Sequence, residues 1–325
     1  MIIDVKGLSS SERGYKVGTH NGVFHSDEVV GMAILDIVYE DEGLHVVRTR
    51  DAEELGKCDI VIDVGGGSLD HHVAGFNLKR ETGEMYATAG LVWKDFGIGA
   101  IGNVLMKMGV DIYVQDIYSI KAEIDSKFII PVDLEDNGIK AETHIFSFIP
   151  SFVPSFTEKN PDYEKAFFKA ETMACSILRK IIEKMIVKRF AKNIIVPLMK
   201  EEYHEYQTHS DRYLGIITLP SQTMPWLENV VKENDNMESC IKFVIFPYPD
   251  GGWAAQCVPP SLERKFEQLV PFPKEWAGLK NQELQEVSGI PQATLCHNGC
   301  FFARAISREG IIDMCRIALR ESNDR

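Results

Sequence analysis

The chain has 325 residues, of which 45% are hydrophobic, 10% aromatic and 26% charged. This composition is typical of a globular protein and excludes a collagen, a coiled coil and a largely disordered chain. The formal net charge is −13, from 35 basic and 48 acidic residues. Because proteins that bind long duplex DNA neutralise many phosphates with a basic face, we expect no tight binding of duplex DNA.

The negative charge is concentrated in the first half of the chain. Residues 1–150 carry 25 acidic and 13 basic side chains, a net charge of −12, whereas residues 151–325 carry 23 and 22, a net charge of −1. The first half therefore has either a solvated acidic surface or carboxylates gathered to hold cations. Two divalent ions would offset part of this charge, and the near-neutral second half can supply bases for phosphate.

Nothing in the sequence predicts membrane insertion or secretion. No apolar run reaches the roughly 18–20 residues of a membrane helix, and the start resembles neither a signal peptide nor an Arg-rich transit peptide. The seven cysteines are scattered and form no CxxC pair, which is typical of reduced thiols. We expect a cytoplasmic protein, with the nucleus and the mitochondrion left open.

The sequence pattern of the first half predicts alternating strands and helices. We expect strands at residues 15–17, 45–49 and 59–64, and helices at residues 27–39, 84–97 and 100–124. The apolar run 59–64 ends at three glycines, as buried parallel strands often do. The pattern predicts an α/β catalytic domain over residues 1–150, with a doubly wound, mainly parallel sheet. Ligands bind such sheets beyond the carboxyl ends of the strands.

A long helix follows the first domain. Asn160 and Pro161 are a typical helix start, and apolar residues from Ala174 to Ile186 form one stripe. This predicts a connecting helix within residues 151–192. The remainder, residues 193–325, predicts a smaller α+β substrate-binding domain, with strands at 213–219, 241–247, 253–258, 293–296 and 301–305 and a helix at 307–321.

Four clusters of histidine and carboxylate residues lie in the first half, and we expect each at a junction between a strand and a loop. They are His20, His25, Asp27 and Glu28; Asp63; Asp70, His71 and His72; and Asp133 and Asp136. Imidazole and carboxylate ligands without cysteine suit Mn²⁺, Mg²⁺, Fe²⁺ or Zn²⁺. A carboxylate such as Asp63 can bridge two ions about 3.5–4 Å apart, the spacing used for in-line displacement at phosphorus.

Each cluster also has a purely structural interpretation. His20 alone can be a hydrogen-bonded core histidine, Asp63 can cap a turn, and Asp133 to Gly138 can form a simple turn. Because all four clusters fall in one predicted domain, a metal centre is the better interpretation.

The clusters also match a known pattern. Asp70-His71-His72 after a strand ending in Asp63 resembles the DHH phosphoesterase superfamily. The pattern His20-x4-His25-x-Asp27-Glu28, with further matches along nearly the entire chain, resembles the melanocyte proliferating gene family of DHH exonucleases. These further matches are 48–51, 89–92, 96–97, 136–139, 273–279, 288–291, His297 and 308–310. The chain departs from the pattern at Ser26, where the family often has Cys, and at His25, where superfamily members often have Asp.

The resemblance implies a two-domain hydrolase of phosphodiesters that uses Mn²⁺ or Mg²⁺. One ion would be held by His20, His25 and Asp63, and the other by Asp27, Asp63, His71 and Asp136. The same resemblance implies that His72 contacts the phosphate or assists the leaving group, and that Asp70 orients a histidine. Asp136 is preferred to Asp133 because the Asp-Asn-Gly match is anchored there, but the choice stays open.

In the second half, the resemblance implies that His297 and a nearby base, Arg304 or Arg308, contact the substrate phosphate. Asn298-Gly299 between two predicted strands also indicates a type I′ hairpin. The cysteines on either side, Cys296 and Cys300, lack the second ligand pair of a zinc site.

The clustered ligands predict a two-metal phosphoesterase in which metal-activated water attacks the phosphodiester, and the resemblance implies that it is a 3′-to-5′ exonuclease on short RNA. The alternatives are a small-molecule phosphatase of the pyrophosphatase type and a non-catalytic metal-binding regulatory protein. The metal, with Mn²⁺ favoured over Mg²⁺, the preferred substrate and the oligomeric state stay open.

Overall fold

The computed structural model describes residues 2–4, 14–139, 142–208 and 214–323. They form two compact units, Met1–Ile186 and Val187–Arg325. The units divide inside the long helix α6 (Tyr163–Thr208), within the connecting segment expected at 151–192. The three-part division at residues 150 and 192 stays a prediction. None of the helices in the described residues has both the length and the apolar character needed to span a membrane.

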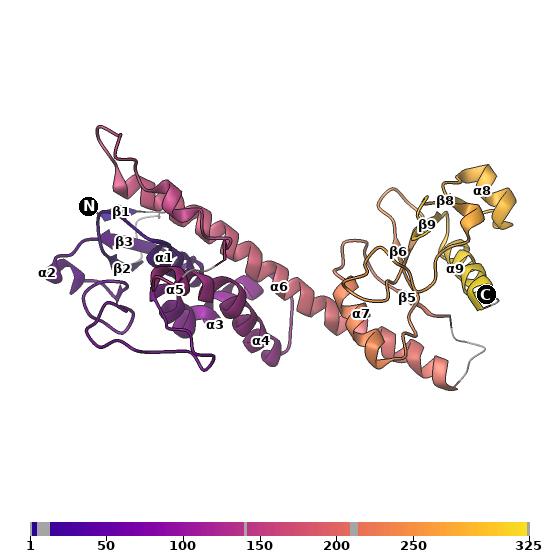
Figure 1. The fold of residues 1–325 in the computed structure, drawn as a ribbon, viewed down its shortest axis with the longest axis horizontal. Helices are drawn as coiled ribbons and strands as arrows, with labels where there is room; N and C mark the ends of the chain where they lie inside the picture. The colour runs from indigo at the N-terminus through magenta and orange to yellow at the C-terminus, as the bar shows by residue number, and fades with distance from the viewer. Residues whose placement is uncertain (1, 5–13, 140–141, 209–213, 324–325) are drawn as a thin grey trace. The chain divides into compact units, whose positions relative to one another are not determined.

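The first unit contains a four-stranded sheet with the strand order β1-β3-β2-β4 (Figure 1). Its strands are β1 (Ile2–Asp4), β2 (Tyr15–Thr19), β3 (Leu44–Arg48) and β4 (Ile60–Val61). Strand β2 runs parallel to both β3 and β4, and β1 is antiparallel to β3. The prediction of a mixed α/β fold with parallel strands is therefore confirmed, and the carboxyl ends of β2, β3 and β4 share one edge of the sheet.

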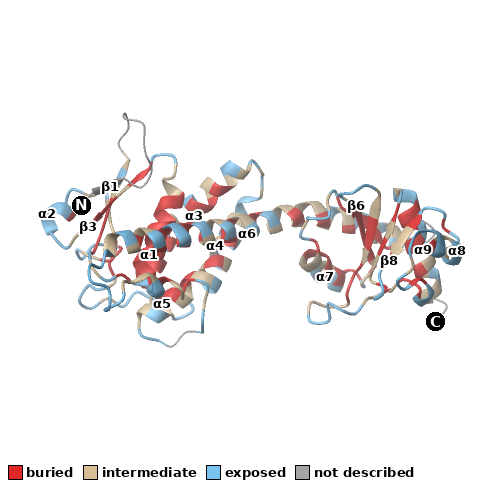
Figure 2. Cartoon of the chain, turned by 90° about the horizontal axis from the view of Figure 1, so that it is seen from above, coloured by how far each residue is buried: buried red, intermediate tan, exposed pale blue. Residues whose placement is uncertain are grey.

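Helices accompany this sheet. They are α1 (Ser26–Val38), α2 (Ala52–Leu55), α3 (Thr88–Met108), α4 (Val114–Ile124), the π-helical turn η1 (Asp125–Ile129), α5 (Ile130–Asp136) and the 3₁₀ turn η2 (Ile149–Phe152). Helix α1 packs against α3, and every residue of α1 from Ser26 to Ile37 is buried (Figure 2). A helix enclosed on all sides tolerates an apolar sequence all round, as α1 has from Val29 to Leu35.

The boundary expected between helices 84–97 and 100–124 is wrong. Helix α3 runs through this region without a break and ends at Gly109, which has a left-handed φ of 63°. Glycine is common at this position because it has no Cβ to clash. Gly97 instead lies inside α3, where a Cβ would approach the Trp93 ring to 2.9 Å. That glycine serves packing against the ring, and does not end the helix.

The second unit contains a five-stranded sheet with the order β5-β6-β7-β9-β8. Its strands are β5 (Ile216–Thr218), β6 (Phe243–Pro247), β7 (Trp253–Cys257), β8 (Ala293–Cys296) and β9 (Phe302–Ala305). Strands β5 and β6 are parallel and the other pairs are antiparallel. Each strand matches a predicted one, although residue 213 of the first prediction lies outside the described residues.

Three helices complete the second unit, with a short 3₁₀ turn. They are α7 (Leu227–Asn236), η3 (Lys274–Trp276), α8 (Asn281–Ser288) and α9 (Arg308–Asn323). Only α9 was expected from the sequence. Helices α7 and α8 are short and polar. Their few apolar residues give too little helical periodicity in the sequence to distinguish them from loops.

The hairpin between β8 and β9 has a different turn from the expected type I′. A type I′ turn requires positive φ at both central residues, but the positive φ of 52° falls on Cys300, and Asn298 and Gly299 have negative values. The amide of Cys300 donates to the carbonyl of His297 at 2.8 Å. A four-residue turn whose last residue, Cys300, is left-handed therefore closes this hairpin.

Candidate metal centre

Two predicted ligands follow neighbouring parallel strands. His20 directly follows β2 and Asp63 follows β4, and both are almost fully buried, at 4% and 3% exposure. His20 Nε2 lies 3.2 Å from Asp63 Oδ2. Asp63 has a left-handed φ of 59°, a conformation that Asp adopts more readily than most residues and that is often found at functional sites. The end of the sheet thus presents these two side chains to each other.

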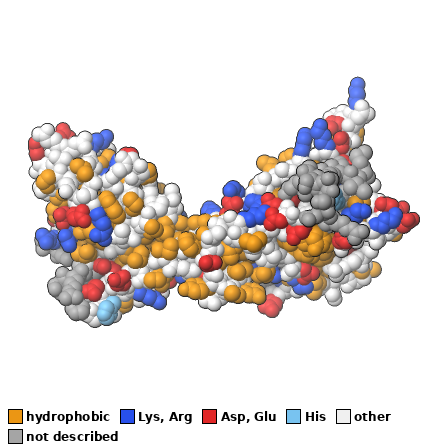
Figure 3. All heavy atoms as spheres, turned by 180° about the vertical axis from the view of Figure 1, so that it is seen from behind, with side chains coloured by type: hydrophobic (Ala, Val, Ile, Leu, Met, Phe, Trp, Pro, Cys, Tyr) orange, Lys and Arg blue, Asp and Glu red, His pale blue; other side chains and the backbone are white. Residues whose placement is uncertain are grey.

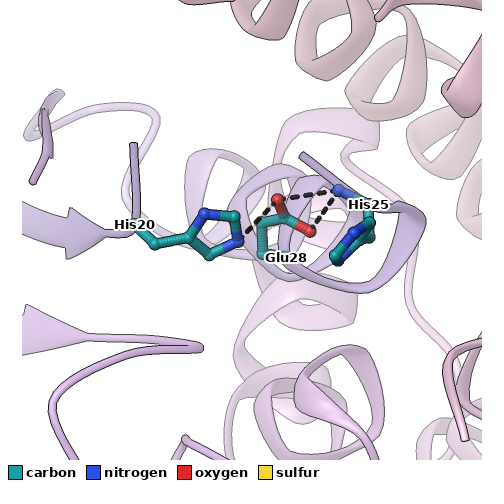
Figure 4. Close-up of side chains that lie close together, drawn as sticks. All are labelled: His20, His25 and Glu28. Carbon is teal, nitrogen blue, oxygen red and sulfur yellow. Dashed lines mark hydrogen bonds and ion pairs between the residues drawn. The ribbon is translucent and has the colours of Figure 1, made fainter. Parts of the chain in front are cut away.

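Glu28 joins this pair from helix α1. Its carboxylate accepts the backbone N–H of His25, the residue before the helix, at 2.8 Å. It also lies 3.1 Å from His20 Nε2, so the carboxylate sits between the two histidines (Figure 4). Glu28 is fully buried and was not among the predicted ligands. The His25-x-x-Glu28 spacing at the helix start carried the signal, since glutamate at the third helical position often reaches back to the cap.

The loop after Asp63 orients two adjacent histidines. Asp70 Oδ2 accepts the N–H of Gly66 at 2.8 Å, and Asp70 Oδ1 accepts the N–H of His72 at 2.9 Å and lies 3.3 Å from His72 Nδ1. His72 Nδ1 is also 3.2 Å from Asp63 Oδ1, and its side chain is 58% exposed. Asp70 therefore fixes the loop and the ring of His72, while the accessible His72 faces solvent beside Asp63.

His71 connects Asp63 to the helical ligands. Its Nε2 lies 2.8 Å from Asp136 Oδ2, and its Nδ1 lies 3.5 Å from Asp63 Oδ1 and 3.7 Å from Asp27 Oδ2. These contacts bring together the four residues that the resemblance assigned to a second ion.

The structure separates Asp136 from Asp133. Asp133 is fully buried, and it pairs with Arg80 at 2.8 Å and accepts the N–H of Gly90 at 2.9 Å. Asp136, one turn later, contacts His71. Both lie on helix α5, so the expectation that every cluster follows a strand is wrong for this one. Asp133 braces α5 against α3, and Asp136 points into the cluster.

Thr88, the first residue of α3, supports two of these carboxylates. Its hydroxyl donates to Asp63 Oδ1 at 2.9 Å, and its backbone N–H donates to Asp27 Oδ2 at 3.3 Å. The positive end of the helix dipole favours negative charge at this position. Sequence reasoning missed Thr88 because it is neither a histidine nor a carboxylate.

The charges in the cluster shift one another's pKa values. Burial by itself lowers the pKa of His20, but hydrogen bonds to Asp63 and Glu28 raise it to about 9. Burial raises the pKa of Asp27 well above its usual range, and the charges of Asp63, Glu28 and Asp136 add to this. In the absence of a cation the cluster therefore retains protons that isolated groups would lose.

His71 and Asp136 behave as an ion pair. Burial by itself lowers the pKa of His71 and raises that of Asp136, but their contact together with neighbouring charged and hydrogen-bonding groups outweighs burial in both cases. The pKa of His71 is raised and the pKa of Asp136 is lowered, so this contact favours the charged form of each group.

The side chains present fit divalent cations. Four overlapping groups of three residues each bring their ligand atoms within 4.8 Å of one another, and they are His20, His25 and Glu28; Asp63, His71 and His72; His25, Asp27 and Asp136; and Asp27, Glu28 and Asp63. Asp27 Oδ1 is buried and has no hydrogen-bond donor, which is costly unless a cation or a proton satisfies it. Nitrogen and oxygen ligands without thiolate suit ions such as Mn²⁺ and Mg²⁺.

A cavity of about 460 Å³ opens onto this cluster. Its lining includes His20, His25, Asp63, Asp70 and His72, together with Arg50, Val23, Val64 and Gly65. A substrate group that enters this cavity therefore meets most of the predicted metal and catalytic residues.

The three predicted substrate contacts in the second unit have separate partners. His297 is exposed and its ring packs on Phe301, with ring centres 4.5 Å apart. Arg304 pairs with Asp250, and Arg308 donates to Thr218 Oγ1 at 3.1 Å. The structure gives these residues no shared ligand group, so their role in phosphate contact stays a prediction.

On the face shown in Figure 3, acidic and basic side chains of the described residues are interspersed.

Fold and site together define an α/β protein with a histidine–carboxylate centre suited to divalent metal ions. Residues 16–319 match the MYG1 exonuclease family, described as an uncharacterised protein family (UPF0160). The chain belongs to this family, which confirms the resemblance recognised in the sequence and the assignment to a family of exonucleases.

Individual relatives agree with this assignment. The chain is 30% identical to the MYG1 exonuclease of Mus musculus, over 94% of this chain and 85% of the relative. It is 29% identical to the MYG1 protein of Chlamydia muridarum, over 94% of this chain and 96% of the relative.

A solved structure of RecJ from Thermus thermophilus in complex with Mn²⁺ also matches. It is 13% identical, with a TM-score of 0.24, over 94% of this chain and 52% of the RecJ chain. The chain thus spans about half the length of that RecJ, and a TM-score this low does not establish a common fold.

Proposed function

We propose that the chain is a two-metal-dependent phosphoesterase with a DHH-like catalytic unit, a 3′-to-5′ exonuclease that acts on short RNA. The observation that carries this proposal is the overlap of the candidate metal groups. Asp27 and Asp63 each belong to two of them, as expected of carboxylates that bridge neighbouring ions. Membership of the MYG1 exonuclease family supports a nucleic-acid substrate.

We infer two ligand sets, which the contacts between these side chains support. His20, Asp63 and Glu28 would hold one ion, with His25 beside them, and Asp27, Asp63, His71 and Asp136 would hold the other. Bound divalent ions would lower the pKa of a water molecule and neutralise charge on the phosphate.

The remaining residues position the substrate and handle protons. His72 is exposed at the mouth of the cavity and held by Asp70, so it can donate a proton to the leaving oxygen or hydrogen-bond the phosphate. Asp70 keeps the ring oriented. Glu28 joins the ligands that the sequence suggested, because its fully buried carboxylate lies 3.1 Å from His20 Nε2.

The decisive experiment is a degradation assay on short, end-labelled RNA and DNA with added Mn²⁺, with pyrophosphate as a third substrate. We expect mononucleotides to be released from the 3′ end of RNA. Phosphate release from pyrophosphate alone selects the small-molecule phosphatase, and bound metal with no hydrolysis of any substrate selects the regulatory protein.

The matched variant for this assay is Asp63→Asn. Asparagine adopts the left-handed conformation of residue 63 as readily as aspartate, so the backbone is preserved while the bridging charge is removed. We expect loss of both metal content and activity, with Asp59→Asn, an exposed acid near the start of β4, as the control. If Asp63→Asn keeps its metal and its activity, the two-metal proposal is wrong.

A further inference from the structure

Arg50 is the one lysine or arginine among the described residues that line the cavity of the metal centre. Its side chain is exposed, and within the described residues no carboxylate lies at ion-pair distance from its guanidinium. An exposed basic side chain in a cavity otherwise lined by histidines and aspartates, without an ion-pair partner of its own, is available to an anionic ligand.

The backbone around Arg50 is held on both sides. The N–H of Thr49 donates to the carbonyl of Thr19 at 2.8 Å, which ties the end of β3 to the end of β2. Asp51 caps α2 by accepting the N–H groups of Glu53 and Glu54 at 2.8 and 3.0 Å. Arg50 therefore projects from a fixed position at the edge of the sheet where His20 and Asp63 lie.

The neighbouring arginine has a different role. Arg48 is buried, donates to the carbonyl of Gly22 at 3.0 Å, and pairs with Glu164 at 3.1 Å. Its guanidinium also stacks on the ring of Phe167 at 4.3 Å. Arg48 thus joins the loop after β2 to α6, and only Arg50 is left to meet a ligand.

We propose that Arg50 binds the phosphate adjacent to the reacting one in an oligonucleotide substrate; this inference rests on the phosphodiesterase function proposed above. The buried His20 and Asp63 form the base of the cavity, where the reacting phosphate meets the ions. Arg50 lies at the exposed rim and reaches the next phosphate along the strand. A planar guanidinium donates two parallel hydrogen bonds to a phosphate in a fixed fork, a geometry that the ammonium group of lysine lacks.

The experiment compares Arg50→Ala and Arg50→Lys with the wild-type chain. Lys94→Ala, which removes an exposed charge on α3 outside the cavity lining, is the control. Three quantities are measured: hydrolysis of a hexanucleotide RNA, hydrolysis of bis-p-nitrophenyl phosphate, which has a single phosphate, and binding of fluorescein-labelled hexanucleotide by anisotropy without turnover.

We expect Arg50→Ala to raise KM and Kd for the RNA by roughly tenfold to a hundredfold. The kcat for RNA and the hydrolysis of the single-phosphate ester stay unchanged, and Arg50→Lys lies between the two. The proposal is overturned if Arg50→Ala binds RNA as the wild type does, or if it loses the single-phosphate ester equally. Failure of the wild type to hydrolyse either substrate refutes the proposed function, whereas anisotropy still tests Arg50.

Discussion

The hydroxyl of Thr88 donates a 2.9 Å hydrogen bond to Asp63 Oδ1, and this bond fixes the carboxylate at the centre of the candidate metal groups. The same threonine begins α3, so the position of the helix and the orientation of the carboxylate are coupled. A group that orients a metal ligand commonly changes metal affinity tenfold to a hundredfold when it is removed.

Thr88→Val keeps the shape of the side chain and removes this donor. We expect the Kd for Mn²⁺ to rise by about tenfold, because Asp63 is then free to rotate away from the ligand position. Isothermal titration calorimetry measures the change. Thr172→Val, at an exposed position on α6, is the matched control and should leave the Kd unchanged; equal affinities for the two variants would refute the role of Thr88.

A second prediction separates the two aspartates of α5. Asp136→Asn removes the partner of His71, and we expect it to lose metal while the protein stays folded. Asp133→Asn leaves Arg80 and Gly90 without their shared carboxylate, so we expect a loss of about 1–3 kcal/mol in the free energy of unfolding with metal affinity retained. Urea unfolding and metal titration of both variants test this. If Asp133→Asn loses the metal and Asp136→Asn keeps it, Asp133 is the ligand.

The sequence predicted the parts of the site that repeat a local pattern. His20 and Asp63 follow short apolar strands, and parallel pairing of those strands is enough to bring them together. Asp136 could not be separated from Asp133 from the sequence, because the choice depends on which face of α5 packs against Arg80. Residues such as Thr88 act through a single hydrogen bond to a distant segment, and no local pattern reveals that bond.

The same limit applies to the helices. The break expected between residues 97 and 100 does not exist, and α3 runs through Gly97, Gly99 and Gly102 because its tertiary contacts outweigh the low helix propensity of glycine. Helix α1 was predicted to within one residue because its charged start and its apolar length are both visible in the sequence.

A third prediction concerns two of the glycines in α3. A Cβ on Gly90 would lie 1.9 Å from Asp133 Oδ2 and 2.6 Å from Arg80 Nη2, whereas a Cβ on Gly102 would meet nothing within 4 Å. We expect Gly90→Ala to destabilise the protein by about 3 kcal/mol through overpacking. We expect Gly102→Ala to stabilise it by roughly 0.5–1 kcal/mol, because alanine is the better helix former. Urea unfolding of both variants measures the two changes in the free energy of unfolding. Changes of the same sign would contradict the packing around Gly90.

The fourth prediction is a dependence of metal affinity on pH. Without metal, contacts with Asp63 and Glu28 hold the pKa of His20 at about 9 despite its burial, so His20 is protonated at neutral pH. A metal ion binds only the neutral imidazole, and its binding therefore displaces a proton. The pKa of Asp27 is also raised by burial and by neighbouring carboxylates. A proton on Asp27 therefore also competes with the metal ion, and more strongly at lower pH.

Affinity for Mn²⁺ should therefore increase from pH 6 to pH 8 by roughly tenfold per pH unit for each proton displaced. Calorimetric titrations in buffers of different ionisation enthalpy count the protons released. The free energy of unfolding of the metal-free protein should show the opposite trend and fall as pH rises. The contribution of protonated His20 is complete below its unfolded pKa of 6.5 and is lost as pH rises through about 9. Affinity that is constant over this range, with no proton release, would show that His20 does not bind the ion.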